Sequence, residues 1–126
     1  MVTAQIGRDK YKTEIISGNH QLLSDETVEN GGEDFGPEPP EFLLVALASC
    51  TAITLRMYAD KKGWPLEKVK VDVEKIKEEW KTIFQLTIFF EGDLSQEQRQ
   101  RLLEIANACP VHKTLTSPIE IDTKLI

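Results

Sequence analysis

Residues 41–50 read EFLLVALASC, an almost unbroken apolar run that ends at the thiol of Cys50. The pattern predicts a helix over residues 40–62, because proline suits the first turn of a helix and Gly63, followed by Trp-Pro, ends it. Residues 42–53 are apolar on every side of this helix, so no side of it is suited to face water. We therefore expect a central helix that is covered by a sheet or by a second subunit.

Strands are predicted on both sides of this helix by alternation of apolar and polar residues. The segments with this character are residues 11–17, 20–26, 68–77, 82–92 and 119–126. Gly18-Asn19 separates the first two, and this pair is suited to a hairpin turn. The order of strands, buried helix, strands, amphipathic helix and strand predicts one α+β domain over residues 1–126.

A second helix is predicted to begin at Ser95, because Ser95 and Gln98 have the spacing of a capping box. Apolar residues then recur at helical spacing, which would place Cys109 on the buried stripe of this helix. The members of the stripe are Leu102, Ile105, Ala106 and Cys109. Pro110 can also open a short helical turn, in which case Cys109 would lie near the positive end of that helix.

The long segment of residues 29–40, ENGGEDFGPEPP, is predicted to be a loop because it combines three glycines with three prolines. Loops of this length in compact domains are often functional.

Composition excludes several classes of function. A net charge of -6 argues against nucleic-acid binding, which depends on lysine and arginine. The N-terminus has no apolar signal segment, and the longest apolar run is too short and interrupted for a bilayer, so we expect a cytoplasmic protein that does not enter membranes.

Two cysteines and two histidines in none of the usual spacings predict no metal site. Cytoplasmic thiols stay reduced, so a free, catalytic or redox-cycling pair is expected rather than a structural disulfide.

Two stretches of the sequence resemble the signature regions of the OsmC/Ohr superfamily, and its OsmC-like branch more than Ohr itself. They are GPEPPEFLLVALASCTAITLRMYADKKGWPLEKVKV at residues 36–71 and ACPVHKTL at residues 108–115. The resemblance covers roughly residues 36–126. It implies an intertwined homodimer with antiparallel sheets around the long buried helix. It also implies active sites near the dimer interface, each with a peroxidatic cysteine, here Cys50, and a resolving cysteine, here Cys109, and no metal or other cofactor.

The resemblance leaves the group that activates Cys50 open. Ohr-type peroxidases supply an arginine from the N-terminal part of the chain, held by a glutamate near the start of the central helix. This chain has no arginine between residues 9 and 55, and Glu41 lies nine residues before Cys50 where the Ohr pattern has ten. Histidine can stabilise a thiolate or act as its base. The candidates for supporting residues are therefore His112, Glu41, Arg8 and His20.

Packing offers a simpler interpretation of the same residues, since free cysteine is among the most buried residue types and a lone histidine is often only solvated. Our first hypothesis is a thiol-dependent reductase of organic hydroperoxides, recycled by a dithiol reductant. The alternative is a dimer of the same fold that binds a small hydrophobic molecule, or senses redox state, without efficient peroxidase turnover.

Overall fold

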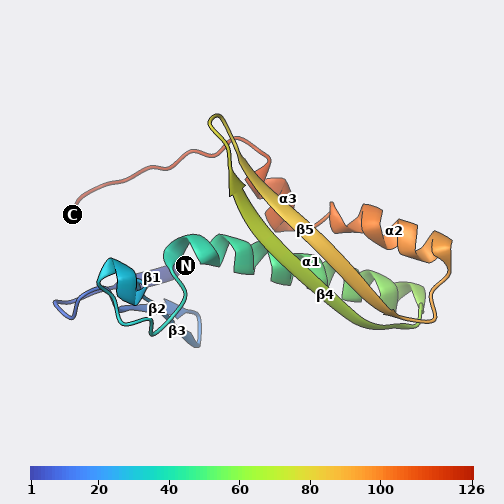
Figure 1. Ribbon diagram of the computed structural model, residues 1–126, viewed down its shortest axis with the longest axis horizontal. Coiled ribbons are helices and arrows are strands. Elements are labelled where there is room, and N and C mark those ends of the chain that lie inside the picture. The colour runs from blue at the N-terminus through green and yellow to red at the C-terminus, as the bar shows by residue number, and fades with distance from the viewer. The chain divides into compact units, whose positions relative to one another are not determined.

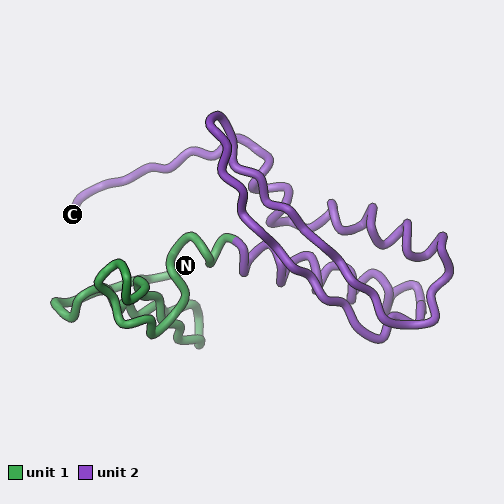
Figure 2. The backbone as a smooth tube through the Cα atoms, in the orientation of Figure 1, with its two compact units in different colours: residues 1–43 green, residues 44–126 purple.

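The structure, a computed structural model, describes residues 1–126 as an α+β chain (Figure 1). The chain divides into two compact units, residues 1–43 and residues 44–126, each of which is described by itself (Figure 2). In chain order the elements are β1 (Val2–Gln5), β2 (Thr13–Ser17), β3 (His20–Ser24), the 3₁₀ turn η1 (Val28–Asn30), α1 (Pro39–Lys62), β4 (Leu66–Lys77), β5 (Thr82–Gly92), α2 (Gln96–Ala106) and α3 (Pro110–Leu115).

The first unit contains a three-stranded antiparallel sheet in the order β1-β2-β3. Ser17 pairs with His20, which confirms a hairpin with Gly18 and Asn19 as its two-residue turn. Gly18 has a φ of 59°, a left-handed conformation that glycine adopts without steric cost. The sequence did not predict β1, which is only four residues long and pairs with β2 from Val2 opposite Ser17.

The loop between β3 and α1 is organised by one carboxylate, that of Asp25, which is only 2% exposed. Its Oδ1 accepts a hydrogen bond from the N–H of Glu26 at 2.7 Å, and its Oδ2 accepts from Phe35 at 3.1 Å and from Glu33 at 3.3 Å. Burial would raise the pKa of the Asp25 carboxyl, but these backbone donors outweigh burial and hold the pKa below its ordinary value. The loop is therefore closed around a charge.

The second unit consists of the antiparallel β4–β5 hairpin with α1 and α2 against one of its faces (Figure 1). Its core is formed by apolar side chains of these elements: Leu55, Ala59, Leu66, Leu102 and Ala106, with Val69, Ile88 and Phe90 packed against them. Each fully buried leucine contributes about 1.5–3 kcal/mol relative to an exposed one. The predicted capping box at Ser95 and Gln98 is present and begins α2.

Helix α1 is covered on only one side within the chain. Its buried residues recur every four positions, and they are Leu47, Thr51, Leu55 and Ala59. On other sides Val45, Ile53 and Met57 are 52%, 58% and 67% exposed. The expectation that the whole helix is wrapped is therefore met along one stripe only, and the remaining apolar surface has no cover in a single chain.

The length of α1 corrects the expectation about membranes. Its 24 residues are long and apolar enough to cross a bilayer, judged by length and composition alone, whereas the sequence suggested that the apolar run was too short. The apolar character extends further along the helix than the run of residues 42–53 indicated. A core helix of a globular protein has the same composition, so this single helix is weak evidence for a membrane span.

Two further predictions about the C-terminal part are wrong. Cys109 does not continue the stripe of α2, because α2 ends at Ala106 and Cys109 is the N-cap of α3. Residues 119–126 form no strand, and Ile121 and Leu125 are 83% and 98% exposed. A strand needs a neighbour that pairs with its backbone groups, and the single chain offers this segment none.

Replacement of Asp25 by asparagine tests the role of the charge in the loop. We expect Asp25→Asn to lower the melting temperature at about pH 7, and to lower it less at about pH 3, where the wild-type carboxylate is itself becoming protonated. The sign follows from the lowered pKa, since the stabilisation is present above the pKa of the unfolded chain and is lost as the pH falls through that of the folded chain.

Thermal unfolding followed by circular dichroism at the two pH values measures this difference. Asp34→Asn is the control, because the Asp34 side chain is an exposed carboxylate of the same loop. An equal loss at both pH values for Asp25→Asn would show that shape, and not charge, holds the loop.

Candidate functional site

The two cysteines meet inside the second unit. Cys50 lies in the middle of α1 and is half-buried, whereas Cys109 lies between α2 and α3 and is 0% exposed. Both thiols are free, and the two side chains are neighbours, since each affects the pKa of the other. The fold thus brings together two residues that lie 59 positions apart in the sequence.

The surroundings of Cys109 favour its thiolate. Pro110 is the first residue of α3, as predicted, and the free backbone N–H groups of Val111 and His112 lie at the Cys109 sulfur. Burial would raise the pKa of the Cys109 thiol, but hydrogen bonds from Cys50 and from these N–H groups outweigh burial and lower the pKa. The helix end therefore supplies the stabilisation that the sequence suggested.

The surroundings of Cys50 favour its protonated thiol. Burial raises the pKa of Cys50, and the hydrogen bond with Cys109 raises it further because Cys50 donates the proton. The backbone N–H of Val111 and the hydroxyl of Thr54 oppose this rise but do not reverse it. Of the two thiols, Cys109 is therefore the one whose thiolate the surroundings stabilise more.

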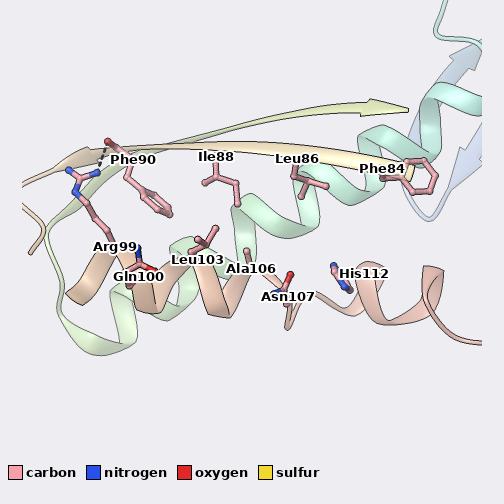
Figure 3. A pocket seen from close by; sticks show the side chains of 10 residues that line it. All are labelled: Phe84, Leu86, Ile88, Phe90, Arg99, Gln100, Leu103, Ala106, Asn107 and His112. Carbon is pink, nitrogen blue, oxygen red and sulfur yellow. Dashed lines mark hydrogen bonds between the residues drawn. The ribbon is translucent and has the colours of Figure 1, made fainter. Parts of the chain in front are cut away.

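An open cavity of about 470 Å³ lies between β5 and α2 (Figure 3). One wall is apolar and consists of the inward side chains of β5, which are Phe84, Leu86, Ile88 and Phe90. Arg99 lies at one end, where it donates to the carbonyl of Phe90, and His112 lies toward the other end, near α3 (Figure 3). The cavity is therefore a mainly apolar space with a polar group at each end.

A second cavity of about 400 Å³ shares Phe84, Leu86 and His112 with the first and reaches Leu47 of α1. Leu47 lies three residues before Cys50, about one turn of the helix. His112 therefore lines both cavities from the turn of chain that also carries Cys109.

The other sequence candidates belong to the first unit. Arg8 lies between β1 and β2, and His20 begins β3. Glu41 lies in the first turn of α1, roughly 13 Å from Cys50 along the helix axis at 1.5 Å per residue. Of the six candidates, the structure brings together Cys50, Cys109 and His112.

Neither a nearby arginine nor a metal cluster adds to the thiol pair. Arg56 is directed away from Cys50, since its guanidinium binds the Asp60 carboxylate and the carbonyl of Leu66. No group of three or more His, Cys, Asp or Glu side chains is placed to hold a metal ion. The groups that favour a thiolate at this pair are backbone N–H groups, hydroxyls and the partner thiol.

Two hydroxyl groups of the site were missed from the sequence. Thr54 lies four residues after Cys50, so its hydroxyl reaches the Cys50 sulfur on the same face of α1. Thr51 is fully buried beside Cys109 and favours a lower pKa of the Cys109 thiol. Spacing along the helix could have identified Thr54, but Thr51 is recognised only once α1 and the α2–α3 turn are packed together.

Comparisons with known proteins agree on one family. The model of the OsmC family, described as OsmC-like protein, matches residues 31–124. No curated protein matches the sequence. Among solved structures, an OsmC-like protein from Mycoplasma pneumoniae is similar with a TM-score of 0.77 and 21% identity, covering 91% of this chain and 85% of its own.

Two hydroperoxide resistance proteins share the fold. The organic hydroperoxide resistance protein OsmC from Legionella pneumophila has a TM-score of 0.64 and 22% identity, covering 92% of this chain and 88% of its own. The organic hydroperoxide resistance protein OhrB of Bacillus subtilis has a TM-score of 0.64 and 23% identity, and the match covers 92% of this chain and 89% of OhrB. The family model matches about three quarters of this chain, and these structures have the same α+β fold. The chain therefore belongs to the OsmC-like protein family.

Proposed function

We propose that this protein is a cytoplasmic, homodimeric reductase of organic hydroperoxides that uses Cys50 and Cys109 alone. The observation that carries the proposal is the proximity of two free thiols, one of which has surroundings that favour the thiolate. A thiolate is the reactive form of cysteine, and a second thiol beside it prevents irreversible oxidation.

The reaction begins with attack of the Cys50 sulfur on the peroxide O–O bond. Because Cys50 has the higher pKa of the two thiols, its proton passes to Cys109 as the attack proceeds. The O–O bond breaks, Cys50 becomes a sulfenic acid, and the alkoxide leaves as an alcohol after it takes the proton from Cys109. The peroxide is reduced by two electrons, and Cys109 is again a thiolate.

The second step closes the disulfide. Cys109 attacks the Cys50 sulfenic sulfur, an S–S bond forms, the S–O bond breaks, and the hydroxide released takes a proton to become water. A dithiol reductant then exchanges with this disulfide, returns both cysteines to thiols and is itself oxidised to a disulfide.

The choice of an organic peroxide is supported by the surroundings of the thiol pair and by the relatives. The cavities along β5 are lined mainly by apolar side chains and reach Leu47, one turn from Cys50. Two proteins of the same fold are organic hydroperoxide resistance proteins. Occupation of these apolar cavities favours a hydroperoxide with a hydrocarbon part over hydrogen peroxide.

A homodimer is supported by the apolar surface that one chain leaves uncovered. Val45, Ile53 and Met57 form an exposed apolar side of α1. In the first unit the inner face of the β1-β2-β3 sheet borders an open apolar cavity of about 440 Å³. Large exposed apolar patches mark interaction surfaces, and a second copy of the chain is the cover that the family fold favours.

Serine variants of the cysteines test the reaction. We expect Cys50→Ser to abolish steady-state reduction of cumene hydroperoxide, because it removes the attacking sulfur. Cys109→Ser should allow one oxidation of Cys50 without recycling, measured by mass spectrometry after one equivalent of peroxide. The wild type is the control and should show a Cys50–Cys109 disulfide. Undiminished turnover in Cys50→Ser would rule the mechanism out.

A charge on the exposed side of α1 tests the dimer. We expect Ile53→Asp to convert the protein to a monomer in sedimentation velocity, because an aspartate cannot be buried unpaired in an apolar interface. Lys61→Glu is the matched control, since it alters charge at an exposed position of the same helix. A wild-type monomer at micromolar concentration, or an Ile53→Asp dimer, would contradict the proposal.

Replacement of the histidines tests the group that supports Cys50. We expect His112→Gln to slow the oxidation of Cys50 by about a hundredfold, the low end of the effect of a positioned acid, because the His112 imidazole hydrogen-bonds the departing alkoxide while Cys109 delivers the proton. His20→Gln should leave the rate unchanged, because His112 lines both cavities of the site and His20 lines neither. Stopped-flow mixing with cumene hydroperoxide measures both rates. A slowed oxidation in His20→Gln with an unchanged rate in His112→Gln would assign the supporting role to His20 instead.

Binding of a small hydrophobic molecule is the second candidate function, and the raised pKa of Cys50 favours it. A thiol that remains protonated near neutral pH is a poor nucleophile, while the apolar cavities remain suitable for a ligand. A hydrophobic molecule that co-purifies with the protein, together with alkylation of Cys50 no faster than that of a free cysteine, would establish this function. A reversible disulfide with very slow peroxide consumption would indicate a redox sensor.

A further inference from the structure

Thr51 is a buried polar residue on an otherwise apolar surface. It is 0% exposed, and the other members of the buried stripe of α1 are Leu47, Leu55 and Ala59. Its Oγ1 is buried and has no hydrogen-bond partner of ordinary geometry. Burial of a hydroxyl without a hydrogen bond is unfavourable, so a partner for the Thr51 hydroxyl is expected in some state of the protein.

The Thr51 hydroxyl does not make the hydrogen bond to the helix backbone that is usual for a hydroxyl inside a helix. Serine and threonine in helices commonly donate to a carbonyl three or four residues earlier. Ser49 of the same helix does so, with its Oγ 2.7 Å from the carbonyl oxygen of Val45. Thr51, two residues later, leaves its hydroxyl free to turn toward the group that faces it from the α2–α3 turn.

The neighbour of Thr51 on that side is the buried side chain of Cys109. The Thr51 Oγ1 makes no hydrogen bond in this structure, but its presence favours a lower pKa of the Cys109 thiol, as do the backbone N–H groups of Val111 and His112. A thiol is a weak acceptor, whereas a thiolate is a strong one. A hydroxyl that finds no good partner in a neutral protein therefore gains one when Cys109 is charged.

We propose that Thr51 is a positioning residue that donates its hydroxyl hydrogen to the sulfur of Cys109 and so holds Cys109 as a thiolate. With the two N–H groups of α3 and the S–H of Cys50, it completes a set of four neutral donors around one buried sulfur. These donors stabilise the anion without an arginine.

The catalytic consequence rests on the proposed function. Cys109 attacks the Cys50 sulfenic acid as a thiolate, so the rate of disulfide formation depends on the fraction of Cys109 that is charged. Loss of the Thr51 hydroxyl lowers that fraction and slows this second step.

The test begins in the Cys50→Ser background, where Cys109 is the only thiol. Thr51→Val keeps the shape of the side chain and removes the hydroxyl, whereas Thr51→Ser keeps the hydroxyl. The thiolate is titrated by its absorbance near 240 nm. We expect Thr51→Val to reduce the thiolate fraction about tenfold at a given pH, a shift of about one pH unit in the midpoint, and Thr51→Ser to restore it.

The matched control is Ser49→Ala, which removes a hydroxyl that is already bonded to the backbone of the same helix. It should leave the titration of Cys109 unchanged. An unchanged titration in Thr51→Val would overturn the proposal. If valine prevents folding, as judged by thermal unfolding, Thr51→Ala is titrated in its place with the same two outcomes.

A second measurement separates this inference from the proposed function. In the protein with both cysteines, dimedone traps the Cys50 sulfenic acid after addition of cumene hydroperoxide, and Thr51→Val should accumulate more of the trapped form than the wild type. A shifted titration without any trapped sulfenic acid would retain the role of Thr51 and reject the peroxidase. Peroxide turnover with an unshifted titration would reject the role of Thr51 alone.

Discussion

The second unit depends on the contact of one stripe of α1 with the rest of that unit. Leu55 and Ala59 pack against Leu102 and Ala106 of α2, and this packing sets where α2 lies and where it ends. The chain then turns at Cys109 and comes back to α1 at the level of Thr51. The distance between the two thiols is thus a consequence of core packing, and a change in that core would move the sulfur atoms apart.

Neutral dipoles govern the charge within the thiol pair. The groups that favour a thiolate here are backbone N–H groups, hydroxyls and the partner thiol. A buried anion needs such donors, because removal from water is otherwise costly. More of them act on Cys109, so its pKa is lowered while that of Cys50 is raised, even though Cys50 is the more accessible of the two thiols.

The exposed surfaces of the chain fit an assembly better than a monomer. One side of α1, one face of the first sheet and the C-terminal segment all present apolar side chains to water. The segment of residues 119–126 keeps the alternation of a strand although no strand forms in one chain. These features agree with the intertwined dimer that we propose for this member of the OsmC-like family.

The sequence by itself determined the local elements. Proline and glycine set the limits of α1 to within one residue, alternation located β2 to β5, and the Ser95 capping box began α2. These signals are local, because they depend on backbone torsion and on neighbours a few residues away. The turn at Pro110 was predictable for the same reason, whereas the choice of Cys50 and Cys109 as a pair came from the resemblance to the OsmC/Ohr superfamily.

Only the tertiary structure decided how these elements work together. It ended α2 before Cys109, left residues 119–126 without a strand, lowered the pKa of the Cys109 thiol and raised that of Cys50. It also buried Thr51, one more polar residue of an apolar helix in the sequence, beside Cys109. Each of these outcomes depends on groups distant in the sequence, since strand pairing, burial and thiol acidity are set by what lies nearby in space.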